Sequence, residues 1–168
     1  MRKHLFPLAA ALALTAASII TAYAAEHTMA MPSSGTVMSA PVTLGALKIS
    51  KGWIKAMLPG QPVAGGYLTV ENTGAEADRL VSVQSASSPD IEIHEMKIED
   101  DVMKMRQLKD GMEIPAGGKI ELKPGGFHLM FMGVAEPFKE GDVVKVVLSF
   151  AKAGDVEVEF PVGASGGK

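Results

Sequence analysis

Cysteine is absent from the 168-residue sequence. Its absence excludes disulfides, zinc–thiolate sites, iron–sulfur clusters and blue-copper centres, because each of these requires cysteine sulfur. Bacterial lipoproteins attach their acyl chains through cysteine, so we also expect no lipid anchor. Stability must therefore come from side-chain packing, and any metal site must use other donors.

Positive charge is scarce, with 16 basic against 19 acidic residues and a formal net charge of −3. No basic stripe is present, so we expect neither nucleic acid nor anionic lipid as a partner. The sequence also lacks a Gly-x-Ser-x-Gly elbow, a phosphate-binding loop and a His-Glu-x-x-His motif. These absences favour a binding protein over an enzyme. We also expect a monomer.

The one long apolar run stands at the N-terminus. Arg2 and Lys3 precede an apolar stretch from Leu5 to Ile20, and the stretch is followed by Ala-Tyr-Ala at 22–24. This pattern predicts a signal peptide over residues 1–24. The run is shorter than the roughly 20 residues that cross a bilayer. We therefore expect a periplasmic protein without a membrane anchor.

Helical periodicity is also missing from residues 46–162. Short apolar or alternating runs follow one another there, separated by Gly, Pro, Asn and Asp, and they predict β-strands. The predicted strands cover 46–57, 65–72, 79–85, 90–98, 102–108, 118–123, 127–133, 143–151 and 155–161. So many short strands in one domain predict an all-β β-sandwich or Greek-key barrel. Residues 25–45 and 163–168 are predicted to be a flexible leader and a flexible tail.

Methionine and histidine gather in one window of the predicted domain, between residues 94 and 132. Because alternate residues of a strand share a face, the pattern places these side chains in phase. Within 127–132 the alternation is complete, with Phe and Leu on one face and His and Met on the other. The in-phase groups are His94 with Met96, Met103 with Met105, and His128 with Met130 and Met132.

This donor set points to copper. A thioether is neutral and polarisable and favours Cu(I), whereas imidazole accepts copper, zinc, nickel and iron. Zinc would normally add cysteine or carboxylate to the histidines. Methionine more often fills a core than binds a metal, so a structural β-sandwich without metal stays open as an alternative. The two histidines in matching phase favour the metal site.

Three segments resemble the PCuAC family, the periplasmic copper chaperones that serve the binuclear CuA centre of cytochrome c oxidase. The segments are GGYLTVENTGAEADRL at 65–80, HEMKIEDDVMKM at 94–105 and EIPAGGKIELKPGGFHLMFMG at 113–133. The family motif is a histidine, ten residues, a methionine, some twenty-one residues and His-x-Met. Here twenty-two residues separate Met105 from His128, which leaves Met103 open as an alternative to Met105.

The resemblance implies a cupredoxin-like β-sandwich that binds one Cu(I) and passes it on. The ligands that it implies are His94, Met105, His128 and Met130, with Met96, Met103 and Met132 as auxiliary candidates. It also implies delivery to oxidase subunit II, with a Sco-type thiol protein as a further partner. A resistance protein that sequesters copper without delivering it would use the same ligands and stays open.

The predicted leader carries its own potential donors. His27, Met29, Met31 and Met38 lie in it, and we hypothesise that they form a weak auxiliary site that accepts Cu(I) or Cu(II). An ordinary linker is an equally good interpretation of this segment.

Overall fold

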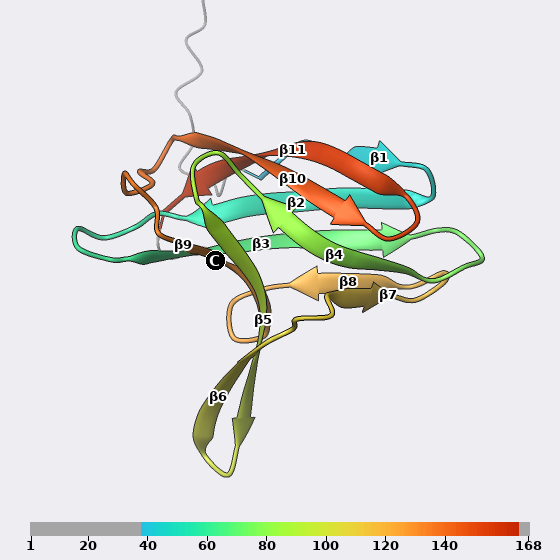
Figure 1. The fold of residues 1–168 in the computed structure, drawn as a ribbon, viewed down its shortest axis with the longest axis horizontal. Coiled ribbons are helices and arrows are strands. Elements are labelled where there is room, and N and C mark those ends of the chain that lie inside the picture. The colour runs from blue at the N-terminus through green and yellow to red at the C-terminus, as the bar shows by residue number, and fades with distance from the viewer. Residues whose placement is uncertain (1–37, 165–168) are drawn as a thin grey trace, which may run out of the picture. The chain divides into compact units, whose positions relative to one another are not determined.

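The computed structural model describes residues 38–164, which form eleven β-strands and no helix (Figure 1). The strands are β1 (Val42–Leu44), β2 (Leu47–Lys55), β3 (Val63–Asn72), β4 (Asp78–Gln84), β5 (Asp90–Glu99), β6 (Val102–Gln107), β7 (Met112–Ile114), β8 (Lys119–Leu122), β9 (Phe127–Met132), β10 (Val143–Phe150) and β11 (Gly154–Gly163). Each of the nine predicted strands overlaps an observed one. In this range the structure shows no helix long and apolar enough to span a membrane.

Two short strands were not predicted. β1 falls inside the range predicted as a flexible leader, and it pairs with β2 across a turn in which Gly45 has a φ of 57°. β7 pairs with β4 and buries Met112 in the core. Three residues are too few for an alternating pattern to be seen.

β11 also extends to Gly163, into the predicted tail. The predicted signal peptide at 1–24 and the leader residues His27, Met29 and Met31 lie outside the described residues.

The strands form two layers that share β11. One layer runs in the order β6-β5-β9-β3-β2, with β1 beside β2 and β8 beside β3, and the other contains β10, β4 and β7. β11 pairs antiparallel with β10 along most of its length, and its last two residues pair parallel with β2. In Figure 1, β10 and β4 lie across β2 and β3. The predicted β-sandwich is therefore confirmed.

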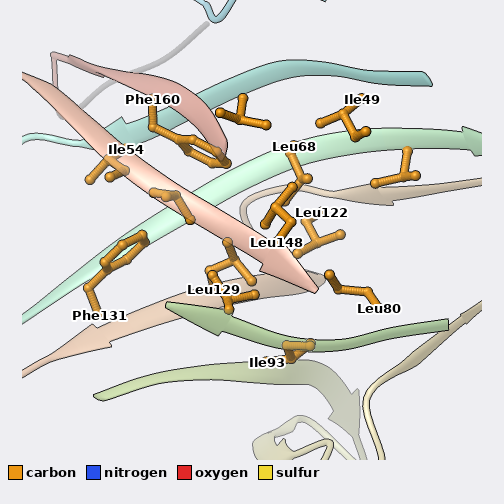
Figure 2. Packing of buried hydrophobic residues seen from close by; sticks show 14 of the residues in the cluster. Ile49, Ile54, Leu68, Leu80, Ile93, Leu122, Leu129, Phe131, Leu148 and Phe160 are labelled. Atoms are coloured by element: carbon orange, nitrogen blue, oxygen red, sulfur yellow. The ribbon is translucent and has the colours of Figure 1, made fainter. Parts of the chain in front are cut away.

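The core between the layers fixes the orientation of β5 and β9. Figure 2 shows side chains of both layers meeting there, and the largest are at most 1% exposed: Ile49, Leu68, Leu80, Leu129, Phe131, Leu148 and Phe160. Burying one such side chain contributes about 1.5–3 kcal/mol. Because Leu129 and Phe131 point inward from β9, His128 and Met130 must point to the outer face of the layer.

One buried carboxylate joins the start of β4 to the turn between β10 and β11. Asp78 Oδ1 accepts hydrogen bonds from the backbone N–H groups of Arg79 (2.7 Å) and Lys152 (2.9 Å), and Oδ2 accepts one from Ala153 (3.0 Å). Burial alone would raise the pKa of Asp78, but the three N–H donors outweigh it and hold that pKa below its ordinary value.

Replacing this carboxylate should destabilise the domain in a pH-dependent way. Asp78→Ala leaves buried N–H groups without a partner, so we expect the free energy of unfolding at pH 7 to fall by about 2 kcal/mol. Because the pKa is depressed on folding, this stabilisation is present above the unfolded value of about 3.9 and is lost as pH falls through the folded pKa.

Urea unfolding at pH 7 and pH 3 measures both effects, with Asp155→Ala in exposed sequence of β11 as the control. The difference in free energy of unfolding between wild type and Asp78→Ala should be smaller at pH 3 than at pH 7. A difference equally large at both pH values would contradict the role given to this carboxylate.

Candidate metal centre

Two histidines face each other on the outer face of the first layer. The register of β5 on β9 places His94 directly opposite His128. Their ring centroids lie 5.8 Å apart with the planes tilted by 48°. His128 is 7% exposed, and the side chain of His94 is 12% exposed. With metal–nitrogen bonds of about 2 Å, rings at this separation can hold one ion between them.

Hydrogen bonds fix both imidazole rings. Nε2 of His94 lies 2.5 Å from Oε2 of Glu92, and Nδ1 of His128 lies 3.1 Å from the carbonyl oxygen of Gly126. Nδ1 of His94 is buried and has no hydrogen-bond partner among the described residues. A buried polar atom without a partner costs about 1–3 kcal/mol, so this nitrogen is a favourable place for a ligand.

Three methionines lie on the same sheet face as the histidine pair. Met130 lies opposite Glu92 of β5 and Gly65 of β3, and Met96 lies opposite Met105 of β6. A hollow of about 170 Å³ beside His128 is lined by Val63, Ala64, Gly65, Tyr67, Met96, Gly125, His128 and Met130. Thioether sulfurs therefore lie on the same face as the two imidazoles, as does the Glu92 carboxylate that contacts His94.

The register also ranks the two methionines of β6. His94 lies opposite Gln107 of β6. Met105 is two residues from Gln107, about 7 Å along the strand, and Met103 is four residues from it, about 13 Å along the strand. Met105 is 45% exposed and Met103 is 63% exposed. Met105 is thus the closer candidate to the histidine pair, although it lies beside the hollow rather than in its wall.

The auxiliary candidates divide in the same way. Met96 contributes to the wall of the hollow together with His128 and Met130. Met132 lies opposite Val63 and Asp90, four residues along β9 from His128. The structure therefore brings Met96 to the histidine pair and leaves Met103 and Met132 farther along their strands.

The β5–β6 hairpin that carries Met105 extends away from the other strands (Figure 1). On the side opposite the methionines, the buried Glu95 pairs with Arg106 at 2.7 Å and with Lys97 at 3.1 Å. The Arg106 and Lys97 hydrogen bonds hold the pKa of the Glu95 carboxyl below its ordinary value. The Glu95–Arg106 pair links β5 to β6, whose register places Met105 opposite Met96, whereas Lys97 lies on β5 with Glu95.

Several neighbours of the site were not found from the sequence. Trp53 is buried, with its ring centroid 4.7 Å from that of Tyr67, and Tyr67 lines the hollow. Glu92 and Gly65 also belong to the site. Glu92 is two residues from His94 in a predicted strand and so shares its face, which could have identified this carboxylate from the sequence. Gly65 and Tyr67 come from β3, and only the pairing of β3 with β9 brings them there.

Comparison with known proteins identifies the family. Residues 47–162 match the family described as "Putative lipoprotein LpqE-like", and the chain belongs to this LpqE-like family. The protein "Putative lipoprotein Lxx21020" of Leifsonia xyli subsp. xyli is 34% identical over 116 residues, which are 69% of each chain.

Solved structures of PCuAC domains are similar to this chain. The "Copper-bound PCuAC domain from PmoF2" matches with a TM-score of 0.64 and 26% identity, covering 74% of this chain and 98% of that domain. The "Apo PCuAC domain from PmoF1" also has a TM-score of 0.64, with 25% identity and coverage of 74% and 99%. Apo-DR1885 from Deinococcus radiodurans, at 20% identity, a TM-score of 0.52 and 97% coverage of both chains, supports the fold alone. The resemblance to PCuAC proteins and the cupredoxin-like fold are confirmed.

Two adjacent glycines test the assignment of the faces of β3. A Cβ added at Gly66 would lie 2.6 Å from the ring of Phe131 in the core, whereas one at Gly65 would meet the Tyr67 hydroxyl at 2.8 Å on the site face. The packed Phe131 ring has no space to move into, so Gly66→Ala should lower the free energy of unfolding by about 1–3 kcal/mol. Gly65→Ala should cost less, because a tyrosine hydroxyl end can shift. Thermal or urea unfolding of both variants measures the contrast, and the reverse order would contradict the assignment.

Proposed function

We propose that this protein is a periplasmic copper chaperone that binds one Cu(I) through His94, Met105, His128 and Met130. The observation that carries the proposal is the pair of facing imidazoles, 5.8 Å apart, with thioethers beside it on the same sheet face. It works by binding and exchanging its metal, without catalysing a reaction.

The donor chemistry supports Cu(I) over other metals. Thioether and imidazole are neutral donors, and soft sulfur stabilises the reduced ion. Structural zinc sites usually contain cysteine, and calcium requires six to eight oxygen ligands. A set of two imidazoles and two thioethers matches neither of these. A neighbour of 26% identity is described as copper-bound, which is in keeping with the proposal.

The exposure of Met105 suggests how the metal leaves. This side chain is 45% exposed on a projecting hairpin, whereas His128 is 7% exposed. A thioether dissociates without taking up a proton, so an incoming donor of a partner can replace Met105 first. The buried imidazoles would hold the ion until that exchange has begun. Release is then driven by ligand substitution at the hairpin.

The proposed recipient is the CuA site in subunit II of cytochrome c oxidase, with a Sco-type thiol protein as a further partner. This assignment follows from the resemblance to the PCuAC family, and the periplasmic location follows from the predicted signal peptide at 1–24. A strain that lacks the gene should contain oxidase depleted of copper at normal copper supply. Fully metallated oxidase in that strain would favour sequestration of copper without delivery.

Ligand variants test the copper site itself. His94→Ala, His128→Ala, Met105→Leu and Met130→Leu should each raise the Kd for Cu(I) at least tenfold, about 1.4 kcal/mol. Leucine keeps the size of methionine and removes only the sulfur. The measurement is a titration of the mature protein with Cu(I) in competition with a chromogenic chelator.

Met103→Leu and Met132→Leu are the matched controls, because these methionines lie on the same face but four residues from the histidine level. Both should leave the Kd unchanged. Met96→Leu decides whether Met96 or its cross-strand neighbour Met105 supplies the fourth donor. Unaltered Cu(I) affinity in all four ligand variants would overturn the proposed site.

A further inference from the structure

The two histidines of the proposed site are held through different ring nitrogens. Glu92 contacts His94 at Nε2, and the backbone carbonyl of Gly126 contacts His128 at Nδ1. A carboxylate and a carbonyl oxygen only accept hydrogen bonds, so each of these two ring nitrogens must carry a proton. In a neutral imidazole the other nitrogen then holds the free lone pair. The free donors are therefore Nδ1 of His94 and Nε2 of His128.

The surroundings of His94 agree with this assignment. Its Nδ1 is the buried atom that has no hydrogen-bond partner within residues 38–164. Glu92 lies opposite Met130, so its carboxylate is on the same face as the proposed ligands. Among the described residues, the salt bridge of Glu92 is to His94. This carboxylate is thus in place to orient one ring.

The second anchor comes from the backbone. The Gly126 carbonyl that contacts His128 also accepts a hydrogen bond from the backbone N–H of Met96 at 3.2 Å. One oxygen therefore ties the His128 ring to β5, the strand that carries His94. Both rings therefore have a protein contact that can orient them, and an oriented ligand needs less ordering on binding.

From these contacts we infer that Glu92 is a positioning residue that holds His94 with Nδ1 toward the ion, so that Cu(I) is bound by Nδ1 of His94 and Nε2 of His128. The inference rests on the proposed copper site and adds the ligand atoms and their support. Ligating histidines commonly donate their second N–H to a carboxylate or a backbone carbonyl, and both kinds of acceptor occur here.

Ring-nitrogen NMR tests the ligand atoms directly, because Cu(I) is diamagnetic. Long-range ¹H–¹⁵N spectra of the apo protein should show a protonated Nε2 in His94 and a protonated Nδ1 in His128. Addition of Cu(I) should shift the other nitrogen of each ring. If the Cu(I)-loaded wild type shows Nε2 of His94 as the bound atom, the inference is wrong while the copper site stands. If the wild type takes up no Cu(I), the proposed function itself fails.

Variants of Glu92 test the positioning role. Glu92→Ala should raise the Kd for Cu(I) by about 10–100-fold, the usual effect of losing such a support, and should give a second tautomer of His94 in the apo spectrum. Glu92→Gln keeps an acceptor oxygen and should recover part of the affinity. Glu157→Ala, a matched change on the part of β11 that pairs with β10, should leave affinity and spectrum unchanged.

Thermal unfolding of the same variants separates positioning from stability, since loss of orientation changes the ring spectrum without requiring a lower Tm. A Kd in Glu92→Ala equal to that of Glu157→Ala would overturn the role. Affinity in Glu92→Gln no better than in Glu92→Ala would also count against it. The wild-type spectra remain decisive if a Glu92 variant does not fold.

Discussion

The antiparallel pairing of β5 with β9 is the constraint on which the candidate site depends. That register places His94 opposite His128, while the neighbouring residues Ile93 and Leu129 point into the core. Side chains alternate with a period of two, so a shift of one residue would exchange the two faces. The slip would turn imidazole into the core between the layers and place leucine and isoleucine on the outer face. The same hydrophobic burial that stabilises the sandwich therefore also sets the direction of the proposed metal ligands.

The site combines a rigid part with an exposed part. The imidazoles lie on strands packed against the core and are held by Glu92 and Gly126. Met105 lies on a hairpin beyond the core, where the Glu95–Arg106 ion pair joins the two strands. A carrier of Cu(I) must suppress free ion and still give the ion up to a partner. In the proposed site, two imidazoles held in place would retain the ion, and the one accessible thioether would let a partner replace it.

The sequence indicated the faces of the strands but could not give their pairing. Alternation in 127–132 predicted that His128 and Met130 would share the face opposite Leu129 and Phe131, and the structure agrees. The choice between Met103 and Met105 depended on the β5–β6 register, which only three-dimensional pairing supplies. Glu92 was missed because a carboxylate two residues from a histidine is also typical of an exposed strand. β1 and β7 were missed because three residues carry no periodicity.

X-ray absorption at the copper edge of the Cu(I)-loaded mature protein is the most direct test of the central claim. One copper per chain should show nitrogen and sulfur neighbours together, and the sulfur contribution should decrease in Met130→Leu while Met132→Leu leaves it unchanged. A spectrum with nitrogen or oxygen neighbours alone would show that the thioethers of this face serve packing and do not bind the metal.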